Sequence, residues 1–417
     1  MRFLVFIGIL AGLAMPANAV EKATVAQVEQ ILAEHANKLP PMAPQPGSIQ
    51  ETALLNHAGL IPEVDDRLLS RLGEIELTER MSTLTLYRLV GQYKLGGHAQ
   101  MILQQMADRS ALLKLPADEE IPHAAPDAET QSAMFNAARD YVFGKLSRLP
   151  DFVATRTTTS FDNTPTPLKY VQSGNESAGF RRREIVQRQI SFRNGKEVLE
   201  SASGVETSKP EDGAFESRGE FGTQASVVLM DIDQTSVSFD HWENTMGGIA
   251  AVYRYAVPRE RSHYEVTDHC DDHASFHDFP GYHGLIALAS RNGTILRITL
   301  EAESSQSDPI SHVASVIEYG PVVIGNRRSI CPLRSLAFMM QEAKGCSQGS
   351  HKLQKPISML NQTIFSNYHR FGSSSTMVFD EADNADPIAG VSAEQSVPRG
   401  RSIPLANPGT GTEPKQP

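Results

Sequence analysis

The sequence predicts an α+β protein, in which a helical N-terminal region precedes a large, curved antiparallel β-sheet, an open half-barrel, with one packed helix. Three observations support this class. Apolar residues recur at helical spacing up to residue 148 and alternate with polar ones, at the strand period of two, from residue 152 onward. Leu149-Pro150 lies at the change. Turn signals such as Arg291-Asn292-Gly293 separate the later segments, as between the strands of hairpins.

Residues 1–19 have the three parts of a secretory signal peptide. Arg2 supplies the positive charge, residues 3–15 are apolar, and Ala17-Asn18-Ala19 is a cleavage site of small residues. The apolar run is shorter than the ~20 residues that a helix needs to span a bilayer. We therefore expect cleavage before Val20 and a mature protein that is exported, to the periplasm or outside the cell, with no transmembrane segment.

Helical periodicity then predicts an N-terminal region, residues 20–126. Its predicted helices cover residues 24–36, 63–72, 75–93 and 98–114. Proline-containing stretches at 39–50 and 115–126 interrupt the periodicity and have the composition of linkers. The next segment, 127–148, is strongly amphipathic and begins with Asp127, a residue that favours the N-cap position of a helix.

This helix begins a predicted β domain, residues 127–380. The predicted strands cover 155–161, 183–192, 237–239, 248–257, 263–267, 284–289, 295–302, 313–324, 329–340 and 362–371. Residues 219–231 predict a short helix within this run. The tail, residues 381–417, is rich in Pro, Gly, Ser, Asn and acidic residues, a composition that predicts disorder.

The charge of the chain excludes one class of partner. Its formal net charge is −11, whereas non-specific binding of nucleic acid requires a basic face. Arg181-Arg182-Arg183 is the one dense basic run, and we interpret it as a solvated strand edge. We therefore expect no nucleic-acid partner.

Two stretches carry a resemblance to known proteins. A helix ahead of the strand LPDFVATRTTTSFDN (149–163), followed by a long meander of strands, resembles the half-barrel of the periplasmic lipoprotein-carrier superfamily. The run YHGLIALASRNGTILRITLEAE (282–303) is similar to exported bacterial proteins. Over residues 130–372 the resemblance implies a sheet whose concave face holds an acyl chain or peptide. A lipid, a lipoprotein or a peptide would then be the partner, and no residue role is transferred.

The stretch DHCDDHASFHDFPGYHG (268–284) raises the question of a metal site. In a helical turn, His269 and His273 would lie on one face and could share a zinc ion. His277 would lie about 12 Å from His269 along the helix axis, too far to join them. HExxH and CxxC patterns are absent from the sequence. We interpret the stretch as a polar loop without metal and expect no cofactor; the alternative is a metal-assisted hydrolase that uses residues 269–278.

Three cysteines in an exported chain suggest one disulfide and one remaining thiol. Counting antiparallel strands places the loops that carry Cys270 and Cys346 at the same rim of the sheet. A Cys270–Cys346 bridge is therefore expected, with Cys331 as a buried thiol. Cys270–Cys331 is the alternative, and it requires the first loop to fold back over the sheet.

Catalytic motifs are weak. The chain has no G-x-S-x-G nucleophile elbow and no glycine-rich phosphate loop. His241-Trp242-Glu243 could contact a ligand, although a Trp packed on the sheet is the commoner case. Glu301 and Glu303 share one side of their strand, where Glu318 could approach them; we interpret these carboxylates as solvent-facing charges. We assign no catalytic residue.

Two main hypotheses about function follow. The first is a non-catalytic binding protein, in which the concave sheet, capped by the 127–148 helix, holds an apolar ligand, acyl chain or peptide. The second is the metal-assisted hydrolase. A third alternative is an envelope protein-interaction module that docks a partner through its helical N-terminal region.

Overall fold

We describe a computed structural model of the chain. It describes residues 21–38, 62–145, 151–163, 180–193, 196–200, 215, 219–233, 236–268, 276–305, 308–342 and 356–370. These residues all belong to one compact unit, residues 1–371, and a second unit covers residues 372–417. The predicted signal peptide and the predicted disordered tail therefore lie outside the described residues. Among the described helices, none has the length and apolar character needed to cross a membrane.

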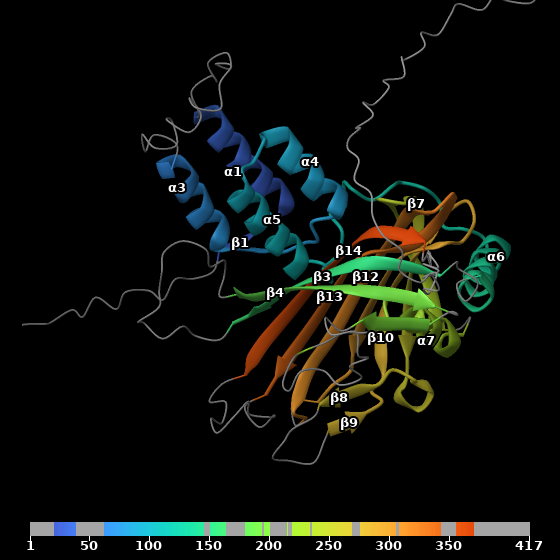
Figure 1. Ribbon diagram of the computed structural model, residues 1–417. Coiled ribbons are helices and arrows are strands. Elements are labelled where there is room, and N and C mark those ends of the chain that lie inside the picture. Colours follow the sequence, from blue (N-terminus) through green and yellow to red (C-terminus); the bar gives the residue numbers. More distant parts are fainter. Residues whose placement is uncertain are drawn as a thin grey trace, which may run out of the picture. The chain divides into compact units, whose positions relative to one another are not determined.

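Four helices of the N-terminal region lie together (Figure 1). They are α1 (Val25–Lys38), α3 (Pro62–Gly73), α4 (Thr83–Tyr93) and α5 (Gly97–Arg109). Apolar side chains from all four, including Val28, Leu72, Leu89 and Leu103, form a separate buried core. Two short parallel strands, β1 (Glu21–Ala23) and β2 (Ile75–Leu77), complete this cluster.

The prediction of one helix over 75–93 is wrong at its beginning. Residues 75–77 form β2 because they pair with β1, more than 50 residues earlier in the chain, and a local pattern does not reveal such a partner. The helix begins only at Thr83, after Ser82. The Ser82 hydroxyl accepts a hydrogen bond from the Thr85 amide at 3.1 Å, which satisfies one unpaired N–H of the first turn.

The main sheet has ten strands in the order β5-β4-β3-β14-β13-β12-β11-β10-β7-β6, and every neighbouring pair is antiparallel. Its strands are β3 (Phe152–Asp162), β4 (Arg181–Arg193), β5 (Lys196–Glu200), β6 (Val237–Thr245), β7 (Gly248–Val257), β10 (Tyr282–Ala289), β11 (Ile295–Ala302), β12 (Ile310–Ile324), β13 (Arg327–Gln341) and β14 (Ile357–Arg370). The sheet is open, so the mixed α+β class with a large antiparallel sheet is confirmed.

Two predicted strands differ from the structure. The strand predicted at 237–239 continues to Thr245, so that His241, Trp242 and Glu243 lie within β6. The strand predicted at 263–267 is reduced to β8 (Val266–Asp268), which pairs with β9 (Phe276–Asp278) in a small separate sheet. In both places the pairing with a neighbour, and not the local alternation, sets the bounds.

One face of the main sheet packs against helices and is called the α6–α7 face. The helices are α6 (Ala128–Arg139), the π-helical segment Asp140–Lys145 that continues it, and α7 (Thr223–Asp231). Met134, Ala138 and Val228 of these helices pack on buried sheet residues such as Tyr253 and Ile298. The side chain of Asp127 caps α6 by accepting a hydrogen bond from the Thr130 amide at 2.7 Å.

The opposite face of the sheet is called the cavity face. Here the segment after α5 packs on the sheet, with Ala111 in a buried cluster with Val316 and Leu336. Beyond this contact, an ion pair between Arg334 of β13 and Asp108 of α5 joins the helical cluster to the sheet. Protein therefore packs on part of each face of the sheet.

Candidate binding cavity

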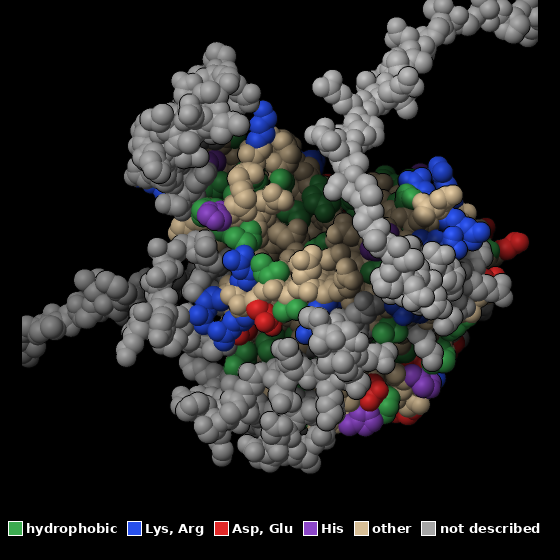
Figure 2. All heavy atoms as spheres, in the orientation of Figure 1, with side chains coloured by type: hydrophobic (Ala, Val, Ile, Leu, Met, Phe, Trp, Pro, Cys, Tyr) green, Lys and Arg blue, Asp and Glu red, His purple; other side chains and the backbone are tan. Residues whose placement is uncertain are grey.

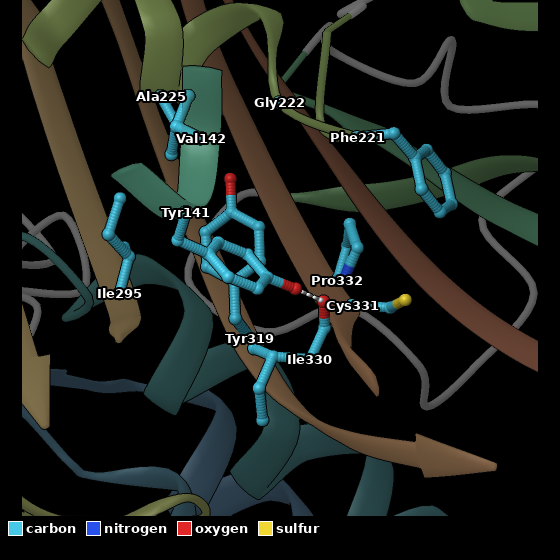
Figure 3. Close-up of a pocket in the computed structure, with 10 residues that line it drawn as sticks. All are labelled: Tyr141, Val142, Phe221, Gly222, Ala225, Ile295, Tyr319, Ile330, Cys331 and Pro332. Carbon is cyan, nitrogen blue, oxygen red and sulfur yellow. Dashed lines mark hydrogen bonds between the residues drawn. The ribbon is translucent and has the colours of Figure 1, made fainter. Parts of the chain in front are cut away.

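A small cavity lies on the α6–α7 face and measures about 20 Å³ (Figure 3). Apolar groups of Val142, Ala225 and Ile295 line it, and the Tyr141 hydroxyl donates a hydrogen bond to the Ile330 carbonyl at 2.9 Å. A volume of this size holds about one water molecule. The face that the 127–148 helix covers therefore has no room here for an acyl chain.

A larger cavity, of about 270 Å³, lies on the cavity face. It is bounded on one side by the start of α4 and the end of α5, and on the other by β6, β11, β12, β13 and β14. Its lining residues include Arg80, Thr83, Leu84, Tyr87, Ala107, Glu243, Met246, Leu296, Arg297, Val316, Glu318, Leu333, Arg334, Ile364 and Phe365. This volume is more than ten times that of the small cavity, which holds about one water molecule. The cavity is therefore large enough for a small ligand or one end of a longer one.

The mouth of the cavity has an apolar rim. Leu84, Tyr87, Met246 and Ile364 line the cavity and are also exposed to solvent, by 37, 54, 44 and 40% respectively. They come from α4, the β6–β7 turn and β14. Exposed large apolar side chains that gather at one opening commonly mark a binding surface.

The floor of the cavity is charged, and Glu243 lies at its centre. This carboxylate is 2% exposed and accepts a hydrogen bond from the Arg80 guanidinium. Its other oxygen accepts hydrogen bonds from Arg297, at 3.2 Å from Nε and 2.9 Å from Nη2. His241 Nε2 lies 3.1 Å from the same carboxylate, and its Nδ1 lies 2.8 Å from Asp240. One carboxylate thus holds two arginines that are 54 and 163 residues away in the chain.

A second charged group adjoins the first. Arg334, which is 9% exposed, pairs with the fully buried Asp108 of α5. Glu318 lies between Arg297 and Arg334, because β12 pairs with β11 and β13 in a register that places the three residues side by side. Its carboxylate accepts hydrogen bonds from the Thr83 hydroxyl at 2.8 and 3.0 Å. The ladder Arg297–Glu318–Arg334 therefore runs across three strands beneath the N-terminus of α4.

Two β-bulges contribute the residues of this floor. On β11 the pairs Ala287↔Arg297 and Leu288↔Ile295 leave Leu296 as an extra residue. Leu296 and Arg297 consequently both line the cavity, instead of pointing to opposite faces of the sheet. On β13 the pairs of Glu318 with Arg334 and of Tyr319 with Pro332 leave Leu333 as an extra residue in the same way. Each bulge thus places a leucine and an arginine at the cavity.

The charged groups shift the pKa values of one another. Burial alone would raise the pKa of Glu243, but Arg297 and Arg80 outweigh it and hold that pKa well below its usual range. Burial alone would lower the pKa of His241, but its hydrogen bonds to Glu243 and Asp240 raise the pKa on balance. Burial raises the pKa of Glu318, although the Thr83 hydrogen bond and Arg297 oppose the shift. Burial lowers the pKa of Arg334 to about 10.

Several nitrogens in this floor lack partners. Arg80 Nε, Arg297 Nη1 and Arg334 Nε are buried and have no hydrogen-bond partner among the described residues. Buried polar atoms in proteins are nearly always hydrogen-bonded, so each exception calls for an explanation. The arrangement offers hydrogen-bond donors and positive charge to a bound group.

The site residues considered from sequence have different positions. His269, His273, Cys270 and Cys346 lie outside the described residues, so the disulfide and the metal alternative stay predictions. His277 does not lie in a helical turn: it is in β9, where its Nε2 is 2.8 Å from Glu265. Pairing of β8 with β9 imposes the extended conformation. Within the described part of the chain, no three His, Cys, Asp or Glu side chains are grouped as metal ligands.

Cys331 is a buried thiol of β13, as expected, and burial raises its pKa to about 12. Arg182 and Arg183 are exposed at the start of β4, beyond the end of β5, which agrees with the predicted solvated edge. Figure 2 shows Lys and Arg side chains gathered at this end of β4, and Arg183 pairs there with Asp162.

The prediction that Glu318 approaches Glu301 on a solvent-facing side is wrong. Glu318 pairs with Arg297, whereas Glu301 pairs with Ala314, four residues further along the strand, or about 13 Å. The Glu318 side chain is only 25% exposed.

Trp242 packs against the core of the α6–α7 face, while its neighbours His241 and Glu243 point to the cavity floor. In this triplet the residues at the cavity are His241 and Glu243, on either side of the Trp, and their alternation with Trp242 along a strand was the sequence feature that indicated it.

No protein-family model, curated protein or solved structure matches this chain.

Proposed function

We propose that the protein is an exported, non-catalytic binding protein that holds an apolar ligand, such as an acyl chain, in the 270 Å³ cavity. The apolar rim carries the proposal. Four of the exposed large apolar side chains line this one opening, and a bound apolar ligand would remove them from water. A pocket with apolar walls and a few convergent polar groups is the usual form of a small-molecule site.

The position of the site differs from the one inferred from the resemblance. The 20 Å³ cavity under α6 and α7 is too small for a ligand, so we place the ligand on the cavity face, between the sheet and the α4–α5 helices. We also propose that the open sheet is curved as a half-barrel and that the protein is related to the periplasmic lipoprotein carriers.

The proposal of export rests on the pattern of residues 1–19. N-terminal sequencing of protein from the envelope fraction tests it: a retained Met1 would contradict export.

The experiment that tests binding uses the mature chain and a neutral fluorescent naphthylamine probe, whose emission rises in an apolar site. Met246→Glu places a charge at the mouth, in an exposed turn where folding should tolerate it. We expect this variant to bind the probe at least ~10-fold more weakly, since moving a charge to an apolar site is costly.

Val323→Glu is the matched control, because Val323 is 62% exposed and lies on β12 outside the cavity lining. Equal loss of binding in both variants, or no binding by the unmodified protein, would contradict the proposal. Extraction of the purified protein with organic solvent, followed by mass spectrometry, would identify a lipid that co-purifies.

A further inference from the structure

The floor of the cavity has more positive charge than an apolar ligand requires. Arg80, Arg297 and Arg334 all line the cavity and are 6, 5 and 9% exposed. Burying a guanidinium is unfavourable unless it is paired and hydrogen-bonded. Three buried arginines at one small cavity therefore need a specific reason.

Two carboxylates have fixed positions in this floor. Glu243 serves both Arg80 and Arg297, and Asp108 serves Arg334. Three arginines against two carboxylates leave one positive charge, apart from His241. Among the described lining residues, Glu318 is the one left to balance that charge, and it does so without a hydrogen bond to Arg334: Oε2 lies 3.8 Å from Arg334 Nη1, beyond hydrogen-bond distance.

Two of the nitrogens without partners belong to the arginines beside Glu318, where this positive charge lies. Arg297 Nη1 and Arg334 Nε are buried without a hydrogen-bond partner among the described residues, and their residues flank Glu318 on the two neighbouring strands. If the arginines served only to hold the fold together, their ion pairs with Glu243 and Asp108 would be explained. The guanidinium nitrogens that have no hydrogen-bond partner at the cavity, within the described part of the chain, would not be explained.

We propose that the ligand is amphipathic and carries a single carboxylate, which binds Arg297 and Arg334 while its alkyl chain leaves along the apolar rim. This inference rests on the proposed function and specifies its ligand. The guanidinium fork matches a planar carboxylate with two hydrogen bonds. One positive charge beyond those paired with Glu243 and Asp108 suits a monovalent head group. The bound carboxylate takes the two open guanidinium nitrogens, while Glu318 keeps its hydrogen bonds to the Thr83 hydroxyl.

The experiment compares four eight-carbon ligands on the mature, delipidated chain by isothermal titration calorimetry at pH 7.5. The ligands are octanoate, octan-1-ol, octylammonium and octyl phosphate. We expect octanoate to bind at least ~10-fold more tightly than octan-1-ol, and octylammonium to bind most weakly. Equal affinity for octanoate and octan-1-ol would overturn the head-group inference and leave the apolar site intact. No binding of any of the four would instead overturn the proposed function. Tighter binding of octyl phosphate than of octanoate would overturn the assignment to a carboxylate.

A variant provides a second test that does not depend on removing an arginine. Glu318→Gln keeps the shape of the side chain and removes the competing charge. We expect it to tighten octanoate binding by about 10-fold and to leave octan-1-ol unchanged. Glu301→Gln is the control, since Glu301 lies on β11 outside the cavity lining, and neither affinity should change. Weaker octanoate binding by Glu318→Gln, or the same tightening in both variants, would overturn the inference.

Discussion

At the scale of single residues, Glu243 organises the charges in the floor of the cavity, because it contacts three basic side chains. It is almost fully buried, and Arg80, Arg297 and His241 all contact its two oxygens. Removing one partner of a buried ion pair leaves the other charge without compensation, which is more costly than the pair is stabilising. The main role of the Glu243 carboxylate in stability is therefore to neutralise the buried guanidinium groups of Arg80 and Arg297.

We predict that Glu243→Gln lowers the free energy of unfolding by about 3–5 kcal/mol, because two buried guanidinium groups lose their counter-charge. Urea denaturation followed by circular dichroism measures this. Glu260→Gln is the control: Glu260 is exposed, so its loss should change stability by less than about 0.5 kcal/mol. Similar stability of the two variants would mean that the buried cluster is not formed.

His241 leads to a prediction about pH. Its folded-state pKa is raised, so protonated His241 contributes stability that is fully present below the unfolded pKa of about 6.5. That contribution is lost as pH rises through the folded pKa. The difference in Tm between the unmodified protein and His241→Gln should therefore be larger at pH 5.5 than at pH 9.

The control for this measurement is His283→Gln, because His283 is exposed on β10. Its Tm difference from the unmodified protein should not depend on pH in the same way. A His241→Gln difference that grows toward pH 9 would show that burial, and not the two carboxylates, dominates the pKa of His241.

At the scale of elements, the β-bulges decide what the cavity face presents. A regular strand would place one residue of each adjacent pair on the α6–α7 face. The extra residues Leu296 and Leu333 instead stay on the cavity side, next to Arg297 and Arg334. Space for Leu333 comes from Gly320 of β12, where a Cβ atom would lie only 2.4 Å from Leu333 Cδ1.

We predict that Gly320→Ala destabilises the protein by about 1–3 kcal/mol through overpacking against Leu333. In a Leu333→Ala background the same change should cost less than about 0.5 kcal/mol, because the obstructing methyl group is absent. Urea denaturation of the two single variants and the double variant gives the coupling energy. Additive effects would mean that the two side chains do not meet.

At the scale of the whole unit, residues 1–371, the helical region and the sheet share more than a linker. The predicted linker 115–126 is itself attached to β6: the Ile121 amide donates to the Trp242 carbonyl at 2.8 Å, and Trp242 Nε1 donates to the Ala124 carbonyl at 2.9 Å. Buried ion pairs at Glu243 and Asp108 add to this contact. The sequence predicted two separable parts, 20–126 and 127–380, and this prediction is still to be tested.

We predict that the two parts stay associated after the chain between them is cut. A protease recognition sequence inserted between Ala125 and Pro126 allows a single cleavage under native conditions. The two fragments should then elute together in gel filtration, since the buried contacts remain, and separate only in denaturant. Separate elution under native conditions would instead support two independent domains.

The sequence by itself determined the α+β class, nine of the ten strands of the main sheet with approximate bounds, the helix after Asp127 and the buried thiol at Cys331; β5 was not predicted. These follow from local information: a period of 3.6 or two, a cap residue, a turn signal. Alternation failed where a bulge interrupts it, so that Ile295 and Ile298 share one face although they are three residues apart.

Only the tertiary structure decided where the cavity lies and which charges form its floor. Arg80, Glu243, Arg297 and Arg334 come from one turn and three strands, and each alone has the sequence context of an ordinary surface residue. Their meeting depends on strand order and on register, which long-range pairing fixes: β14 lies beside β3 across about 200 residues of chain. The physical reason is that burial and ion pairing are properties of neighbours in space, whereas periodicity reports only on neighbours in sequence.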